Sequence, residues 1–444
     1  MTDALSNGAV ANLARKAKQA GRRLANAPSA AKDSVLTRVA EALRREAAAI
    51  LKANAEDVAA AREAVARGEM TRALFDRLVL TPERLEGMVR GVTSVRDLPD
   101  PAHRVIERTQ IAEGLELRKV SCPLGLLAVI FESRPDAVTQ IAALAIKSGN
   151  AVILKGGREV EHTTAALVAG IHRALAETEE IPAEAVTAIY GRKAVAELLA
   201  LDGVVDLIIP RGSNALVQYV QQNTRIPVLG HGDGVCHIYV DFAADQNMAL
   251  RIILDAKTQY PAACNTVETV LVHSSIASEF LPRLASLMIE HKVQLRGCAR
   301  TRESLPGLNL AEVASDEWHT EYSDLVLAIR VVDSLDAALE HIEQYGSHHT
   351  DAIVTEDADA AKRFLREVDS AGVYHNASTR FADGYRYGFG AEVGIGTNRM
   401  LARGPVGLEG LVTFKYELLG SGQTVSEFSG EDAKPFVHRK LPLP

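Results

Sequence analysis

The sequence predicts an α/β protein in which a helical segment precedes two units of parallel sheet. Residues 3–97 are rich in Ala, Leu, Arg, Lys and Glu, with apolar residues three and four positions apart, which predicts helices throughout. From residue 124 onward, short apolar runs alternate with helical stretches, and a second unit of the same kind begins near residue 239. Continuous apolar strands that alternate with helices indicate parallel sheets covered on both faces.

The helical segment ends in a change of pattern. Thr81-Pro82-Glu83 is a helix start, with Thr as the N-cap and Pro in the first turn. Pro99-Asp100-Pro101 breaks the helices, and residues 106–120 contain two strand-like runs around Glu113-Gly114. This pattern predicts a β-hairpin, and a hairpin outside a core needs a partner for its edges.

In the first unit we expect strands at residues 126–131, 151–154, 185–190 and 204–209, and helices at 135–147, 158–178, 193–201 and 213–223. In the second unit we expect strands at 267–273, 325–332, 351–354 and 372–375, and helices at 245–257, 275–291, 335–343 and 358–368. Cofactors bind at the carboxyl ends of such strands. Neither the G-x-G-x-x-G fingerprint nor a Walker P-loop occurs in the chain.

Glycines cluster beyond residue 384, which predicts a segment close to ligands or between domains, and the tail from Ser421 is expected to fray. We therefore divide the chain into residues 1–238, which include the hairpin arm at 105–121, residues 239–400, and a return segment with a C-terminal strand and tail at 401–444.

Composition narrows the class of protein. A net charge of -8 and a pI near 5.9 give no electrostatic reason to bind nucleic acid. The sequence contains no run of 18 apolar residues, so it predicts no membrane-spanning helix. The four cysteines are not spaced as in metal sites or disulfide frameworks. The first residues contain no apolar signal core. We expect a cytoplasmic protein without a metal site.

Cys264 is the candidate nucleophile, in the segment QYPAACNTVET at residues 259–269. The alternative interpretation is that Cys264 is a small buried hydrophobic residue, because most free cysteines are. Tyr260-Pro261 restricts the backbone, the following two alanines leave room for a substrate, and Asn265 brings an amide that can donate to a carbonyl oxygen.

This segment resembles the active-site signature of the γ-glutamyl phosphate reductases, also called glutamate-5-semialdehyde dehydrogenases, a branch of the aldehyde dehydrogenase superfamily. Five more segments of the chain resemble the family and occur in its typical order. They are FESRP at 131–135, VILKGG at 152–157, IPRGS at 209–213, HGDGVCH at 231–237 and RGPVGLE at 403–409. The resemblance spans roughly residues 5–420. It implies an aldehyde-dehydrogenase-like fold, with a Rossmann-type cofactor domain, an α/β catalytic domain and a small β oligomerisation arm.

The resemblance also implies a reaction, the NADPH-dependent reduction of γ-glutamyl 5-phosphate to glutamate-5-semialdehyde and phosphate in proline biosynthesis. Cys264 would form a cysteinyl thioester, and Asn265 would assist. The arm implies a homodimer or homotetramer, and glutamate 5-kinase is a candidate partner. Two alternatives stay open: a hydrolytic NAD(P)-dependent semialdehyde dehydrogenase, and a catalytically silent binding protein on the same fold.

Candidate cofactor residues lie at strand ends of the first unit. Lys155 ends a strand, where it could contact the adenosine ribose or its 2'-phosphate, and Gly156 lets the backbone approach a ligand. Arg211, Gly212 and Ser213 open a helix whose N–H groups suit a pyrophosphate, with a plain Ser N-cap as the alternative. Glu321 matches the superfamily glutamate that binds the nicotinamide ribose. Taken alone, Lys155 and Glu321 could equally be surface residues.

Arg134 and Arg380 are candidates for the substrate's α-carboxylate or phosphate, because guanidinium groups bind planar anions bidentately. Ser378 belongs to the same segment as Arg380, and either arginine could instead be an ion-pair partner. Asp136 stands where many relatives carry Asn, and a carboxylate would oppose a developing oxyanion, so it receives no such role. His348-His349 lack further metal ligands, so we expect exposed or capping histidines.

A hydrolytic dehydrogenase needs a base that activates water, which a glutamate in a Glu-Leu-Gly-Gly segment supplies in the superfamily. The corresponding segment here is VLGHGDG at residues 228–234, without a glutamate. His231 and Asp233 are the remaining candidate bases. We therefore expect the acyl-enzyme to react with phosphate and not with water.

Overall fold

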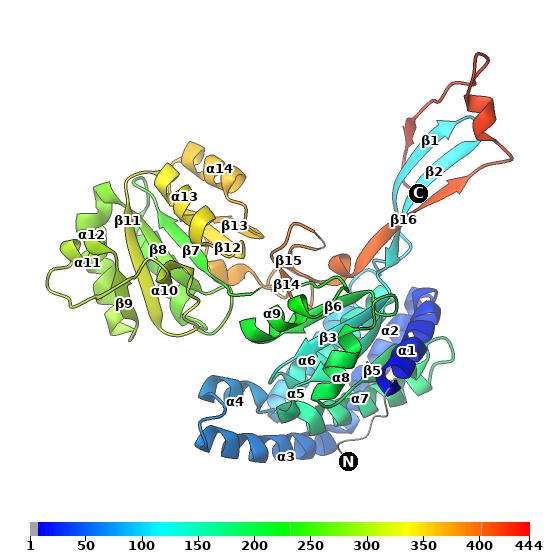
Figure 1. Cartoon of the computed structure of the whole chain (residues 1–444), viewed down its shortest axis with the longest axis horizontal. Coiled ribbons are helices and arrows are strands. Elements are labelled where there is room, and N and C mark those ends of the chain that lie inside the picture. The colour runs from blue at the N-terminus through cyan, green and yellow to red at the C-terminus, as the bar shows by residue number, and fades with distance from the viewer. Residues whose placement is uncertain (1–7, 231, 401) are drawn as a thin grey trace.

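The computed structural model describes residues 8–230, 232–400 and 402–444, and it contains two α/β bodies and a projecting β arm (Figure 1). The chain begins with α1 (Ala9–Ala25), α2 (Ser29–Arg45), α3 (Ala47–Ala66), α4 (Arg72–Leu78) and α5 (Pro82–Arg96). Thr81 is the N-cap of α5, and its hydroxyl accepts a hydrogen bond from Arg84 N at 3.2 Å. The predicted helical segment is thus confirmed over the described residues.

The first sheet has the strand order β5-β4-β3-β6, with every pair parallel. Its elements are β3 (Leu126–Phe131), α6 (Pro135–Ser148), β4 (Ala151–Gly156), α7 (Glu161–Ala176), β5 (Val186–Ala188), α8 (Arg192–Leu199), β6 (Leu207–Arg211) and α9 (Asn214–Gln222). Alternate residues of β3 enter two cores, with Leu127 and Val129 against the α2, α6 and α7 side and Leu126 and Ala128 against the α1 and α8 side. Helices therefore cover both faces, as the apolar strands predict.

The second sheet has seven parallel strands in the order β10-β9-β11-β8-β7-β12-β13. Its elements are β7 (Cys236–Val240), α10 (Gln246–Thr258), β8 (Val267–His273), α11 (Ser274–Glu290), β9 (Gln294–Gly297), α12 (Ala299–Ser304), β10 (Ala311–Glu312), β11 (Val326–Val332), α13 (Leu335–Tyr345), β12 (Thr350–Val354), α14 (Ala358–Glu367) and β13 (Gly372–His375). The sheet begins three residues before the expected position 239. The sequence did not predict β9, α12 or β10, which are short.

The arm is a four-stranded antiparallel sheet in the order β16-β2-β1-β17. The predicted hairpin is confirmed as β1 (Val105–Ala112) and β2 (Leu115–Pro123), and β16 (Val412–Leu419) and β17 (Arg439–Leu441) flank it. Because β17 pairs with β1, the expectation of a fraying tail is wrong for residues 439–441. A further small sheet, β14 (Ile395–Gly396) with β15 (Gly404–Pro405), lies in the glycine-rich segment.

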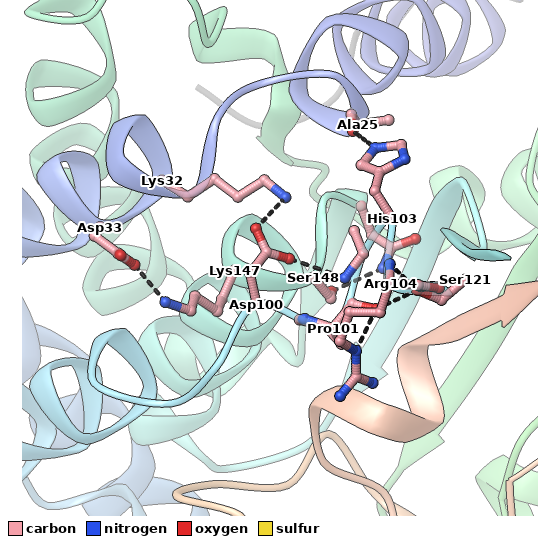
Figure 2. A network of polar contacts seen from close by, with 12 residues as sticks. Ala25, Lys32, Asp33, Asp100, Pro101, His103, Arg104, Ser121, Lys147 and Ser148 are labelled. Atoms are coloured by element: carbon pink, nitrogen blue, oxygen red, sulfur yellow. Dashed lines mark hydrogen bonds and ion pairs between the residues drawn. The ribbon is translucent and has the colours of Figure 1, made fainter. Parts of the chain in front are cut away.

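A polar network joins the root of the arm to the first body, as Figure 2 shows. The ammonium group of Lys32, which is fully buried, lies 2.8 Å from the Asp100 carboxylate. Lys147 forms an ion pair with Asp33. The Ser121 hydroxyl donates to the Pro101 carbonyl at 2.6 Å. These contacts fix where the hairpin leaves the body, because buried ammonium groups are stable only when paired.

Candidate active site

The thiol of Cys264 lies in a tight loop at the amino edge of the second sheet, between α10 and β8. Ala263 N donates to the Tyr260 carbonyl at 3.1 Å, and Thr266 N donates to the Ala263 carbonyl at 2.9 Å. The Thr266 hydroxyl also donates to the Tyr260 carbonyl, at 2.7 Å. Cys264 is half-buried, unlike the fully buried cysteine of the alternative interpretation.

His349 is a functional candidate that the sequence reasoning missed. Its Nε2 lies 3.2 Å from Cys264 Sγ, and its Nδ1 lies 2.9 Å from Thr350 Oγ1. Because only 1% of His349 is exposed, the expectation of an exposed or capping histidine is wrong for this residue. His348 is half-buried, with its Nδ1 2.6 Å from the Asp369 carbonyl oxygen.

The pairing of His349 with Cys264 follows from sheet topology. His349 directly precedes β12, Cys264 precedes β8 by three residues, and β7 pairs in parallel with both strands. Residues that precede parallel strands lie at one edge of a sheet. A search for polar residues just before the predicted strands could therefore have found this pair.

Gly234 allows the chain to approach the thiol loop closely. A Cβ at this position would lie 2.1 Å from the Cys264 carbonyl oxygen, so a side chain here would displace the loop. Gly234 N donates to Glu321 Oε2 at 2.7 Å, and Cys236 Sγ lies 3.4 Å from the same Cys264 carbonyl oxygen. Glu321, the expected ribose ligand, thus lies beside the backbone that supports the thiol.

Arg211 lies within electrostatic range of Cys264, whereas we expected it in the cofactor site. Its Nη1 donates to the Glu392 carbonyl oxygen at 3.1 Å, and its Nη2 is 3.5 Å from the Glu392 carboxylate. Burial lowers the pKa of Arg211 and nearby Arg134 lowers it further, while the charges of Glu392 and Cys264 act in the opposite direction. A guanidinium group within electrostatic range of Cys264 favours its thiolate form.

Arg380 and Ser378 lie beside the same loop. Arg380 Nε donates to Gln259 Oε1 at 2.9 Å, and its guanidinium carbon is 5.9 Å from the centre of the Tyr260 ring. Burial lowers the pKa of Arg380, and the charge of Cys264 opposes this effect. Ser378 Oγ accepts a hydrogen bond from Arg380 N at 3.3 Å. These two predicted substrate residues are therefore adjacent to the thiol loop.

Asn265 is buried next to the thiol. Its Nδ2 donates to the Ala382 carbonyl at 2.8 Å, and its Oδ1 is buried without a hydrogen-bond partner. The contact with Ala382 uses one of the two amide hydrogens, and the other one is the donor that a substrate oxygen would need. The oxyanion role of Asn265 stays a prediction.

A cavity of about 650 Å³ lies at the carboxyl ends of β3, β4 and β6, where we expected a cofactor. Lys155, Gly156 and Ser213 line it, and Arg211 does not. Lys155 Nζ donates to the Gly156 carbonyl oxygen at 2.6 Å, and burial lowers the pKa of Lys155. A Cβ at Gly156 would lie 2.8 Å from Val160, so glycine keeps this wall open. The volume is in the usual range for a cofactor site.

Two carboxylates of the chain bind backbone N–H groups in this cavity. Glu132 Oε2 accepts from Ser213 N at 2.8 Å, and Glu159 Oε1 accepts from Ser133 N at 2.7 Å. Ser213 is also the N-cap of α9, as the alternative interpretation expected. A Cβ at Gly212 would lie 2.3 Å from the Glu132 carboxylate. The helix N-terminus thus binds an anion already, which is the property that a cofactor pyrophosphate requires.

A second cavity, of about 570 Å³, extends from the first body to the thiol loop. Tyr260 and four arginines, together with Asp136, line it. Arg77 Nη2 donates to the Ala262 carbonyl at 2.9 Å, and Arg77 Nε donates to the Tyr260 hydroxyl at 2.9 Å. The other three arginines are Arg84, Arg90 and Arg134. The cavity therefore suits an anionic substrate beside the thiol loop.

Of the two residues that could act as a base to activate water, the structure describes only Asp233. Asp233 is exposed, and its Oδ2 accepts from Asn214 Nδ2 at 2.7 Å. His231 lies outside the described residues.

Within residues 8–230, 232–400 and 402–444, no group of three or more His, Cys, Asp or Glu could bind a metal ion. In the same part of the chain, no helix combines the length and apolar character that crossing a bilayer requires.

Comparison with known proteins identifies close relatives over nearly the whole chain. The model of the aldehyde dehydrogenase family matches residues 2–297. A protein named γ-glutamyl phosphate reductase from Cyanothece sp. is 54% identical over 429 residues, covering 97% of each chain. A protein named γ-glutamyl phosphate reductase 1 from Synechocystis sp. is 53% identical, covering 98% of this chain and 99% of the relative.

Solved structures agree with this family. The crystal structure of γ-glutamyl phosphate reductase from Thermotoga maritima is 41% identical, with a TM-score of 0.89 over 94% of this chain and 99% of that one. An acetylating aldehyde dehydrogenase from Geobacillus thermoglucosidasius has a TM-score of 0.65 at 18% identity, over 94% of this chain and 97% of that one. The second likeness concerns the fold alone.

Proposed function

The chain belongs to the aldehyde dehydrogenase family and, within it, to the γ-glutamyl phosphate reductases, and we propose that Cys264 and His349 together carry its reaction. The protein is an oxidoreductase that reduces γ-glutamyl phosphate to glutamate-5-semialdehyde, a step of proline biosynthesis. The observation that carries the proposal is the 3.2 Å contact between Cys264 Sγ and His349 Nε2.

The cavity of the first body fits the NAD(P) cofactor that the family uses. Gly156 leaves its wall open, and Ser213 offers a backbone N–H at the start of α9. Lys155 would bind the 2'-phosphate, which makes NADPH the preferred form, and Glu321 would bind the nicotinamide ribose. When bound, NADPH supplies the hydride that reduces the thioester.

The first step is acyl transfer to Cys264. With the imidazole of His349 as the proton acceptor, the thiol becomes a thiolate and attacks the acyl carbon of γ-glutamyl phosphate. The carbon–oxygen bond to the phosphate breaks, and the His349 imidazolium transfers its proton to the leaving phosphate oxygen. The sulfur and the imidazole need no rearrangement for this step, because they are already within hydrogen-bonding distance.

The second step reduces the thioester and regenerates the Cys264 thiolate. Reduction of the thioester carbon gives a tetrahedral oxyanion, to which the free amide hydrogen of Asn265 would donate. The carbon–sulfur bond then breaks, which releases glutamate-5-semialdehyde and leaves Cys264 as a thiolate. The proton that His349 gave to phosphate returns from solvent, so the sum of the two steps consumes one proton.

Arginines near the thiol supply the charge that a phosphate group needs. Arg211 and Arg380 both lie within electrostatic range of Cys264 and are largely buried. Guanidinium groups in a desolvated site stabilise the charge that develops on a departing phosphate. We therefore assign Arg211 to the phosphate, together with Arg380, in place of its expected role at the cofactor; Ser378 orients Arg380.

The arm supports assembly of the protein with a second copy. Phe414, Tyr416 and Leu418 are exposed apolar residues on β16, which is an edge strand of the arm. Edge strands with apolar side chains associate with another strand unless they are covered. This surface supports the proposed homodimer or homotetramer, built through β16. The kinase partner and the cytoplasmic location stay predictions, supported only by the pathway and the sequence.

The test supplies γ-glutamyl phosphate from glutamate, ATP and a glutamate kinase in the same vessel, and measures NADPH oxidation and phosphate release together. We expect one phosphate for each NADPH oxidised, after subtraction of the phosphate that the acyl phosphate loses spontaneously. The Cys264→Ala variant gives that background. NADPH oxidation at the same rate in the variant would contradict the proposal.

A further inference from the structure

Two charged side chains in the cavity beside the thiol loop have no ion-pair partner within hydrogen-bonding distance among the described residues, although both lie within electrostatic range of Arg211. Arg134 is the N-cap residue of α6, and Asp136 lies in the first turn of the same helix. Both are half-buried and both line the cavity of about 570 Å³. Within the described residues, no hydrogen bond or ion pair reaches the Arg134 guanidinium. The Asp136 carboxylate receives one side-chain contact, from Gln140 Nε2 at the long distance of 3.5 Å.

Charged groups that line a cavity without a close ion-pair partner are partly desolvated at a cost in free energy, and a ligand with complementary charges offsets this cost. The two groups here have opposite signs and start from positions two residues apart. An α-amino acid carries the complementary pair on a single carbon, an ammonium group and a carboxylate. The cavity also reaches the thiol loop, because Tyr260 of that loop is part of its wall.

We propose that Asp136 binds the α-ammonium group of the substrate while Arg134 binds its α-carboxylate. The inference rests on the proposed function and identifies what selects an α-amino acid there. It also explains why a carboxylate is found at position 136. A carboxylate would oppose the oxyanion that forms during the reaction, but it is the best partner for an ammonium group.

The assignment gives the two anionic groups of the substrate to different arginines. Arg211 and Arg380, within electrostatic range of Cys264, take the phosphate, and Arg134, which lines the cavity and lies within electrostatic range of Arg211, takes the carboxylate. Glu83 is the other acid in the wall of this cavity, and it lies in the first turn of α5. It is therefore the competing candidate for the ammonium group.

The test compares two aldehydes that differ only in the ammonium group, glutamate-5-semialdehyde and 5-oxopentanoate. Each is oxidised with NADP and phosphate, and the ratio of their kcat/KM values is the readout. We expect Asp136→Asn to lower this ratio roughly 10- to 100-fold, the usual size of a charged hydrogen bond, with 5-oxopentanoate affected less than about twofold. Arg134→Gln should slow both aldehydes equally, because both carry the carboxylate.

Exposed Asp97, which pairs with Arg96 at the end of α5, provides the matched control, and Asp97→Asn should leave the ratio unchanged. Equal losses for both aldehydes in Asp136→Asn would indicate a structural role and overturn the inference. An unchanged ratio in Asp136→Asn, or a drop in Glu83→Gln alone, would overturn it as well. Failure of the wild-type protein to oxidise either aldehyde would instead contradict the proposed function.

Discussion

The two sites differ in what their polar groups do before a ligand arrives. At the carboxyl edge of the first sheet, the backbone donors bind carboxylates of the chain, with Glu132 on Ser213 N and Glu159 on Ser133 N. At the amino edge of the second sheet, Cys264 and His349 already contact one another. Cofactor binding must therefore exchange one anion for another, whereas the chemical step starts from a formed pair. Substitutions at the first site should change cofactor affinity, and those at the second should change turnover.

The largest expected effect is at the nucleophile. Cys264→Ala should lower kcat by at least about 10⁴-fold, because the thioester cannot form, and should leave NADPH affinity within about twofold. Initial rates and equilibrium cofactor titration measure the two quantities. Cys298→Ala, another half-buried thiol, serves as the control and should retain activity. Substantial turnover in Cys264→Ala would remove Cys264 from its central role.

The second-largest expected effect is on turnover when His349 is replaced, compared with replacement of its sequence neighbour His348. His349→Asn should lower kcat roughly 10²- to 10⁴-fold, the usual contribution of a general acid–base group, while NADPH affinity is retained. Alkylation of Cys264 by iodoacetamide should also slow near neutral pH, because less thiolate is present. His348→Asn is the matched control, since His348 contacts the Asp369 carbonyl instead. Equal effects of the two variants would mean that His349 supports the fold and not the reaction.

At the first site the expected effect is on affinity. Lys155→Ala should raise the KM for NADPH roughly 10- to 100-fold and the KM for NADH far less, because the lost contact is to the 2'-phosphate. The rate of Cys264 alkylation should not change. Equal increases for both cofactors would place Lys155 at the adenosine ribose and away from the 2'-phosphate.

The smallest expected effect is an increase in NADPH affinity, whereas the preceding variant lowers it. Glu132→Gln should tighten NADPH binding by about 2- to 10-fold, because a neutral amide competes less well than a carboxylate for Ser213 N. Equilibrium titration of the cofactor, with kcat as the second readout, measures it. Weaker binding in this variant would show that Glu132 contributes to the cofactor site and does not compete with the phosphates.

The sequence predicted the strands well where apolar runs had clear ends. β3, β8 and β13 have the expected bounds, and the rule of carboxyl ends located the cavity that contains Lys155 and Ser213. The same rule did not predict that Arg211 lies outside the lining of this cavity, because a strand end gives the position of a residue but not the direction of its side chain. β17 was missed for a related reason. Its three residues have no apolar pattern, and only pairing with β1 makes them a strand.

His349 shows the main limit of reading the chain in order. We examined it with its neighbour His348 as a metal candidate, whereas its partner is Cys264, 85 residues away. The contact requires β8, β7 and β12 to be adjacent, and a sequence of strands does not fix their order in a sheet. Asp136 shows the converse. Its unusual identity was visible in the sequence, but the role that we propose for it required the cavity that it shares with Arg134.

The central claim is that the acyl-enzyme on Cys264 exchanges with phosphate and not with water. His349 is close enough to activate either one, so the geometry of the pair alone does not decide between them. The direct test is oxidation of glutamate-5-semialdehyde with NADP in the presence and absence of phosphate or arsenate. We predict that steady turnover requires the added anion and that, without it, the reaction stops after about one equivalent of NADPH per Cys264. Rapid oxidation to glutamate without phosphate or arsenate would contradict the account and favour a hydrolytic dehydrogenase.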